Sequence, residues 1–74
     1  MNKNTYMIIT IGKNSQYRSY WAKHHNTNNL WHELKDIPSL YNVTICDTKK
    51  EAVDVSRFWN ECYKKNGTYM KSYR

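Results

Sequence analysis

The stretch TYMIITIGKNSQYRSYWAK, residues 5–23, predicts two neighbouring strands and decides the fold class. Residues 5–12 are rich in β-branched and aromatic side chains and too apolar for a surface helix, so we expect a central strand that ends at Gly12. The residues KNSQ supply a turn, and residues 17–23 then alternate with the period of a second strand. The two segments therefore predict a β-hairpin.

The alternation in the second strand leaves two interpretations open. It places Tyr17, Ser19 and Trp21 on one face and Arg18, Tyr20 and Ala22 on the other. The rings are either a platform on which bases stack, with neighbouring cations neutralising phosphate, or part of the core beneath a helix. The register of this strand decides between them.

Residues 26–46 predict a short helix and a third strand. Asn and Thr side chains in HNTNN can cap a helix that Pro38 ends, with apolar positions at Leu30, Trp31, Leu34 and Ile37. Residues 39–46 alternate again, which places three apolar side chains on one face: Tyr41, Val43 and Ile45.

The segment DTKKEAVDVSRFWNECYKKNG, residues 47–67, predicts a helix with both ends marked. Thr48 and Glu51 have the spacing of a capping box, and Gly67 stands where a C-cap belongs. The apolar side chains recur at helical intervals, at Ala52, Val55, Trp59 and Cys62. We expect Trp59 and Trp31 to build the core rather than a ligand cage.

These elements predict a single small α+β domain over residues 1–74. Its sheet has three mostly antiparallel strands, the long C-terminal helix packs on one face, and the short helix lies between strands 2 and 3. The other face is open to a partner or to a second copy of the chain. Residues 68–74 form a basic tail that is either a short edge strand or frayed.

The charge of the chain lies mainly at its two ends. The net charge is +6, and neither residues 1–25 nor residues 64–74 contain a single acid. If these ends meet in space, they form one basic face that favours an anionic partner. The candidate binding residues are Arg18, Tyr20, Lys23, His24 and His25, with Lys64, Lys65, Lys71 and Arg74 adding positive charge; Tyr63, Tyr69 and Tyr73 are candidate anchors for a partner.

Catalytic and metal-binding patterns are missing from the sequence. The His and Cys residues lack the spacing of a zinc site, and the glycines do not form a phosphate loop. Cys62 is expected on the apolar stripe of its helix, where a buried thiol is not activated as a nucleophile. Cys46 and Cys62 are expected to be free thiols. We therefore expect no enzyme, no metal and no cofactor.

The segment KKEAVDVSRFWNECYKKNGTY, residues 49–69, resembles the C-terminal helix of small uncharacterised proteins encoded by phages and prophages of low-GC bacteria. The resemblance covers this segment alone and carries over no functional residue. It implies a genetic setting in which very small proteins bind and inhibit host factors, including antiviral defence.

Two functions follow from the sequence as hypotheses. The first is a non-enzymatic protein, phage or mobile-element encoded, that holds nucleic acid or a nucleotide on a basic aromatic surface. The second is a stoichiometric inhibitor that docks onto an acidic patch of a bacterial host or defence enzyme. No apolar run approaches the roughly 20 residues of a membrane span. We expect the cytoplasm of a bacterial host, no membrane partner, and leave a homo-oligomer open.

Overall fold

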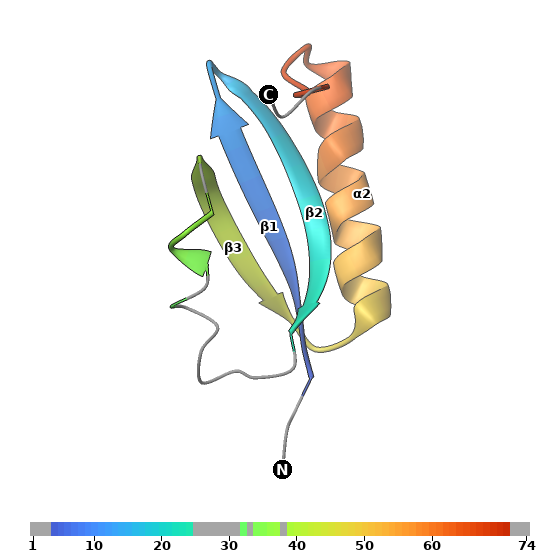
Figure 1. Ribbon diagram of the computed structural model, residues 1–74. Helices are drawn as coiled ribbons and strands as arrows, with labels where there is room; N and C mark the ends of the chain where they lie inside the picture. Colours follow the sequence, from blue (N-terminus) through green and yellow to red (C-terminus); the bar gives the residue numbers. More distant parts are fainter. Residues whose placement is uncertain (1–3, 25–31, 33, 38, 72–74) are drawn as a thin grey trace.

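The computed structural model describes residues 4–24, 32, 34–37 and 39–71. It contains a three-stranded antiparallel sheet in the order β2-β1-β3 and one long helix beside it (Figure 1). The elements are β1 (Thr5–Lys13), β2 (Gln16–His24), β3 (Leu40–Cys46) and α2 (Lys49–Lys65). The predicted α+β class, the central position of the first strand and the C-terminal helix are confirmed.

The β1–β2 hairpin closes through a two-residue turn. Its pairing runs without a break from Thr5 opposite His24 to Lys13 opposite Gln16. The turn residues Asn14 and Ser15 have φ angles of 55° and 63°. Positive φ at both positions belongs to the type I′ turn, whose twist matches that of the flanking strands. The predicted hairpin is therefore present, with its register fixed by this turn.

The third strand carries an extra residue opposite β1. Thr10 pairs with Asn42, whereas Ile11 pairs with Leu40, so Tyr41 has no partner in the ladder. This irregularity is a β-bulge, which breaks the strict alternation of side chains between the two faces. The prediction that Tyr41 shares a face with Val43 and Ile45 is therefore wrong, because Tyr41 lies beside Asn42 on the side of α2.

The ends of α2 have the predicted capping residues. The Thr48 hydroxyl accepts a hydrogen bond from the Glu51 N–H at 3.2 Å, and the Glu51 carboxylate accepts one from the Asp47 N–H at 3.2 Å. The carboxylate thus reaches one residue beyond the N-cap that a strict capping box uses. At the other end Gly67 has a φ of 74°, a left-handed conformation that glycine adopts without steric cost.

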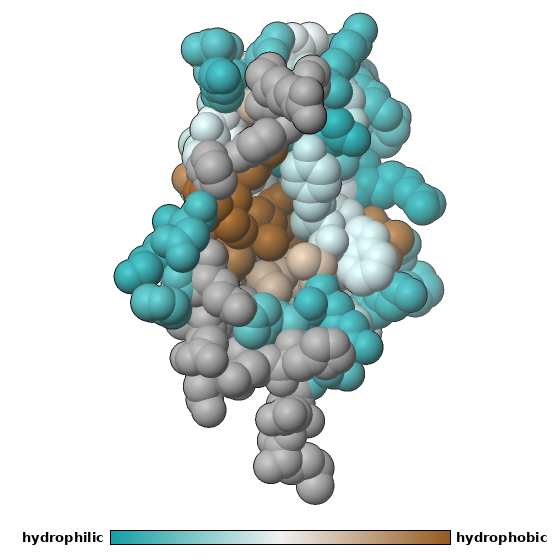
Figure 2. Space-filling view, in the orientation of Figure 1, coloured by the Kyte–Doolittle hydropathy of each residue, from teal (hydrophilic) through white to brown (hydrophobic). Residues whose placement is uncertain are grey.

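Both faces of the sheet bury apolar side chains. Ile8, Cys46 and Ala52 form a cluster beneath α2. On the opposite face Met7 packs against Leu34, from the segment between β2 and β3, so this face is covered in part. Ile45 is nevertheless 48% exposed. Figure 2, in the orientation of Figure 1, shows hydrophobic side chains gathered over the sheet.

The predicted short helix between strands 2 and 3 is not seen as an element of the described residues, although His32 and Leu34 have helical conformation. Most of the positions expected to form it lie outside those residues, including Leu30, Trp31 and Pro38. Within the described segment, the N–H of Ile37 donates to the carbonyl of Leu34 at 3.0 Å, as in a single turn.

Candidate functional site

A cluster of cations and tyrosine rings lies where β2 meets the segment after α2. The Arg18 guanidinium lies 5.1 Å from the ring centre of Tyr20 and 5.4 Å from that of Tyr69. The Lys64 ammonium lies 4.9 Å from the same Tyr69 ring centre. Arg18 also donates to the backbone carbonyl of Lys71 at 3.3 Å. We call these five residues the Tyr69 cluster.

Backbone hydrogen bonds hold Tyr69 in this position. The Tyr17 N–H donates to the Thr68 carbonyl at 2.7 Å, and the Met70 N–H donates to the Tyr17 carbonyl at 2.9 Å. Residues 68–70 thereby form a parallel bridge to the outer edge of β2. Met70 anchors this segment, with only 2% of its surface exposed. The cluster is therefore built on paired backbone at one end of the sheet.

The Tyr69 cluster is predominantly positive. The Lys64 ammonium lies 3.4 Å from the Glu61 carboxylate in an exposed pair. Such surface pairs contribute little and leave the cation accessible. Among the described residues, Arg18 has no carboxylate within ion-pair distance. Cation–π contacts of this kind hold the cationic groups close to an aromatic surface without neutralising them.

The predicted binding residues do not all meet. Arg18, Tyr20, Lys64 and Lys71 belong to the cluster, which joins the two basic ends of the chain. Lys23 and His24 lie at the other end of β2, opposite Tyr6 and Thr5. Five residues along a strand span roughly 16 Å, so Lys23 and Arg18 cannot contact the same small group. Lys65 is exposed in the last turn of α2, and His25 and Arg74 lie outside the described residues, as does Tyr73.

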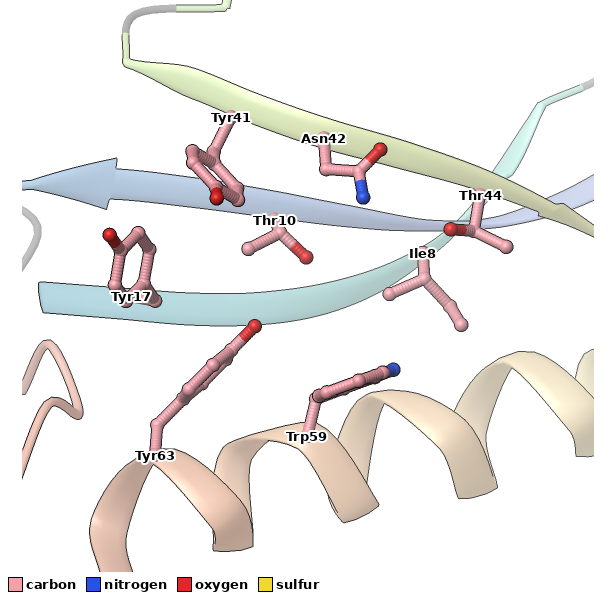
Figure 3. Close-up of a pocket in the computed structure, with 8 residues that line it drawn as sticks. All are labelled: Ile8, Thr10, Tyr17, Tyr41, Asn42, Thr44, Trp59 and Tyr63. Carbon is pink, nitrogen blue, oxygen red and sulfur yellow. The ribbon is translucent and has the colours of Figure 1, made fainter. Parts of the chain in front are cut away.

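An aromatic groove of about 330 Å³ opens between β3 and α2 (Figure 3). Its four rings follow one another in contact: Trp59 lies 6.3 Å from Tyr63, Tyr63 lies 5.6 Å from Tyr17, and Tyr17 lies 5.0 Å from Tyr41, measured between ring centres. The stick view shows these rings arriving from β2, β3 and α2 around one space. We call this site the aromatic groove.

The rest of the groove lining is neutral. Ile8 and Thr10 of β1 form its floor and are 3% and 7% exposed. The Thr10 hydroxyl is already engaged with the Ser19 hydroxyl at 2.8 Å. Asn42 and Thr44 of β3 are exposed and complete the lining. The groove thus offers ring faces together with an amide and a hydroxyl, and none of the described residues that line it is charged.

The expectation that Trp59 builds the core is wrong. Trp59 is 46% exposed and lines the aromatic groove. The reason is that α2 lies alongside β2 rather than over the middle of the sheet (Figure 1). Its closest approach is made by small residues, since Ala52 and Ser56 are the buried residues of the helix. Ala52 and Ser56 are four positions apart and so lie on the same side of the helix. This pair of small residues was the signal in the sequence for the side of α2 that packs against the sheet.

The structure also places the two strand rings whose role the sequence left open. Tyr17 and Trp21 face the side of the sheet on which α2 lies. Tyr17 is half-buried within the groove, whereas Trp21 is 40% exposed, with the Lys49 ammonium 5.2 Å from its ring centre. Neither ring is fully buried in the core, so both present part of their surface to solvent.

Metal-ligating side chains are not brought together in the described part of the chain. No three His, Cys, Asp or Glu side chains gather there closely enough to hold a metal ion. Cys46 and Cys62 are free thiols. None of the described helices is both long and apolar enough to cross a membrane.

Comparison of the chain with protein-family models, with curated proteins and with solved structures gives no match. The arrangement of the described residues is therefore the basis for assigning a function.

Proposed function

We propose that this chain is a non-enzymatic binding protein that holds single-stranded nucleic acid on the Tyr69 cluster. The observation that carries the proposal is that Arg18 and Lys64, from the two basic parts of the chain, both lie against the ring of Tyr69. Proteins that bind single strands combine a positive surface with aromatic rings on which bases stack. We place this activity in the cytoplasm of a bacterial host.

The charge distribution supports a polyanion rather than a single small anion. Lys71 and Lys65 extend the positive surface around the cluster, and the net charge of the chain is +6. Each phosphate that such a surface neutralises releases counterions, so binding weakens with salt. Lys23 and His24, at the far end of β2, would contact a different nucleotide of a longer strand.

Fluorescence polarisation with a labelled single-stranded oligonucleotide, repeated over a salt series, tests this proposal. The variant Arg18→Gln/Lys64→Gln removes two positive charges from the cluster. A matched control, Lys35→Gln/Lys50→Gln, removes two exposed lysines elsewhere. We expect the cluster variant to weaken binding and to reduce the log–log salt slope by about 1.4, against little change of affinity in the control. Equal effects of the two pairs would overturn the assignment of the cluster.

A stoichiometric protein inhibitor is the second candidate, and a separate feature favours it. On the sheet face opposite α2, Ile9, Ile11, Tyr20 and Ile37 line an apolar groove of about 290 Å³. Together with the basic cluster it would suit a bacterial protein whose docking surface combines an apolar side chain with an acidic rim. This reading fits a phage or mobile-element protein that blocks a host or defence enzyme.

The two candidates are separated by nuclease treatment. A protein partner that is captured from bacterial lysate after nuclease digestion, and lost on Ile9→Lys substitution, favours the inhibitor. Capture that disappears with the nuclease favours nucleic-acid binding. Analytical ultracentrifugation of the free chain shows whether a second copy covers the same apolar groove instead.

A further inference from the structure

We propose that the aromatic groove binds one nucleobase of the strand whose phosphates contact the Tyr69 cluster. This inference rests on the proposed function and adds the place where bases are held. Residues of the groove and of the cluster are adjacent in the sequence: Tyr17 precedes Arg18 in β2, and Tyr63 precedes Lys64 in α2. Consecutive residues of a strand point to opposite faces, so the two sites flank the same end of the sheet.

The rings of the groove present surface that the protein itself does not use. Tyr41 is 65% exposed and Trp59 is 46% exposed, although both line the groove. Tyr41 stands in the bulge of β3, where its ring adds nothing to the buried clusters. Large exposed rings around a concave space are typical of a site that stacks a planar ligand.

The polar side chains that line the aromatic groove favour a heteroaromatic ring as its ligand over an apolar side chain of a partner. The Asn42 amide offers both a donor and an acceptor, and within the described chain no group hydrogen bonds to it. The Thr44 hydroxyl stands two residues further along the same strand. Amide side chains pair with the donor and acceptor edges of bases, whereas an apolar ligand would leave them unsatisfied.

The distribution of charged side chains indicates which part of the ligand each site binds. The described lining of the groove contains no cation, so a phosphate placed there would lose its water without gaining a cationic partner. The cations lie instead in the adjacent cluster, on Arg18, Lys64 and Lys71. A single strand carries both neutral planar rings and anionic groups along one backbone, so different nucleotides of the strand can reach the two sites. The base is therefore assigned to the groove and the phosphate to the cluster.

The test compares an oligonucleotide with an abasic strand of the same length, which keeps the phosphates and lacks the bases. We expect the abasic strand to bind about five- to a hundredfold more weakly, the effect of losing a stacked base. Tyr41→Ala should reduce the difference between the two strands, while Tyr41→Phe should preserve it. Thermal melting of both variants verifies that they fold, which the exposure of Tyr41 favours.

The outcomes distinguish this inference from the proposed function. Equal binding of the two strands, with an unchanged salt slope, would overturn the base site and leave the phosphate surface standing. A difference between the strands that survives Tyr41→Ala, and that is also unaffected by Asn42→Ala, would place the base elsewhere and overturn the inference. Failure of both strands to bind at low salt would overturn both proposals.

Discussion

The side-chain amide of Asn60 forms two hydrogen bonds with the backbone of Ser19. Its Oδ1 accepts from the Ser19 N–H at 2.7 Å, and its Nδ2 donates to the Ser19 carbonyl at 2.8 Å. The amide thus occupies the outer edge of β2 in the way that a neighbouring strand would. Residues 68–70 occupy the same edge at Tyr17. An edge whose backbone groups are already paired is protected from pairing with another chain.

Replacing Asn60 should destabilise the fold. Asn60→Ala leaves two part-buried backbone groups without partners, and we expect the free energy of unfolding to fall by about 1–3 kcal/mol. Urea denaturation measures the loss. The matched control is Glu61→Ala, a change of an exposed neighbour, which should remain within about 0.5 kcal/mol of the parent protein. A loss no larger than that of the control would show that the two hydrogen bonds contribute little.

The variant Asn60→Asp should make stability depend on pH. A carboxylate can accept from the Ser19 N–H but cannot donate to the Ser19 carbonyl, so folding favours the protonated carboxyl and raises its pKa. The stabilisation is then present below the unfolded pKa of about 3.9 and is lost as pH rises through the folded pKa. Urea titrations of this variant and of the parent protein across pH 3–7 measure the difference. A constant difference would contradict the two-bond geometry.

The position of the Tyr17 ring should exclude any side chain larger than that of glycine at position 12. A Cβ added at Gly12 would lie 2.9 Å from two carbon atoms of that ring, closer than side chains tolerate. We therefore expect Gly12→Ala to cost about 1–3 kcal/mol, because the ring must move. In a Tyr17→Ala background the same change should cost much less, since the obstacle is gone. A double-mutant cycle from urea denaturation measures this coupling, and equal costs in both backgrounds would rule it out.

The two thiols should differ in reactivity. Burial raises the pKa of the Cys46 thiol, and the nearby carboxylates of Glu51 and Asp47 raise it further. A raised pKa leaves less thiolate at a given pH, and the thiolate is the nucleophile. We expect iodoacetamide to label Cys62 before Cys46 in the folded chain, as followed by mass spectrometry. Unfolding in urea should remove most of the difference, and preferential labelling of Cys46 would contradict the described packing.

The ring of Tyr69 should matter more than its hydroxyl. Tyr69→Phe keeps the face on which Lys64 and Arg18 lie, and oligonucleotide binding should be retained. Tyr69→Leu removes the ring, and we expect binding to weaken by about two- to tenfold because Arg18 and Lys64 lose the surface that positions them. Fluorescence polarisation at fixed salt compares the two variants, and equal affinities would remove the ring from the proposed interface.

Local sequence signals predicted the elements well because each is encoded over a few residues. The type I′ turn at Asn14 and Ser15 joins a run of β-branched and apolar residues to an alternating run, and Thr48 and Gly67 flank the helix. Strand bounds differ from the predicted ones by only a residue or so at each end. The sequence left open whether the two basic ends of the chain meet, and the structure places Arg18 and Lys64 against the same ring of Tyr69.

The groove could not be predicted in the same way because it depends on pairings between distant parts of the chain. The contact of Asn60 with Ser19 sets α2 beside β2, and this lateral position exposes Trp59. The orientation of Tyr41 follows from the pairing of β3 with β1, which no local pattern specifies. Local patterns therefore indicated the cations of the cluster and named Tyr20, Tyr63 and Tyr69 as candidates. They assigned Trp59 to the core and left the role of Tyr17 open.

The bulge at Tyr41 means that the aromatic groove depends on chain length as well as on residue identity. β3 reaches Ile11 with one residue more than a regular ladder needs, and this residue is the ring at the mouth of the groove. Deletion of Tyr41 would restore a regular ladder and leave the buried clusters of the sheet in place. In evolutionary terms, the groove can be gained or lost through an insertion or deletion of a single codon, while the fold that carries it persists.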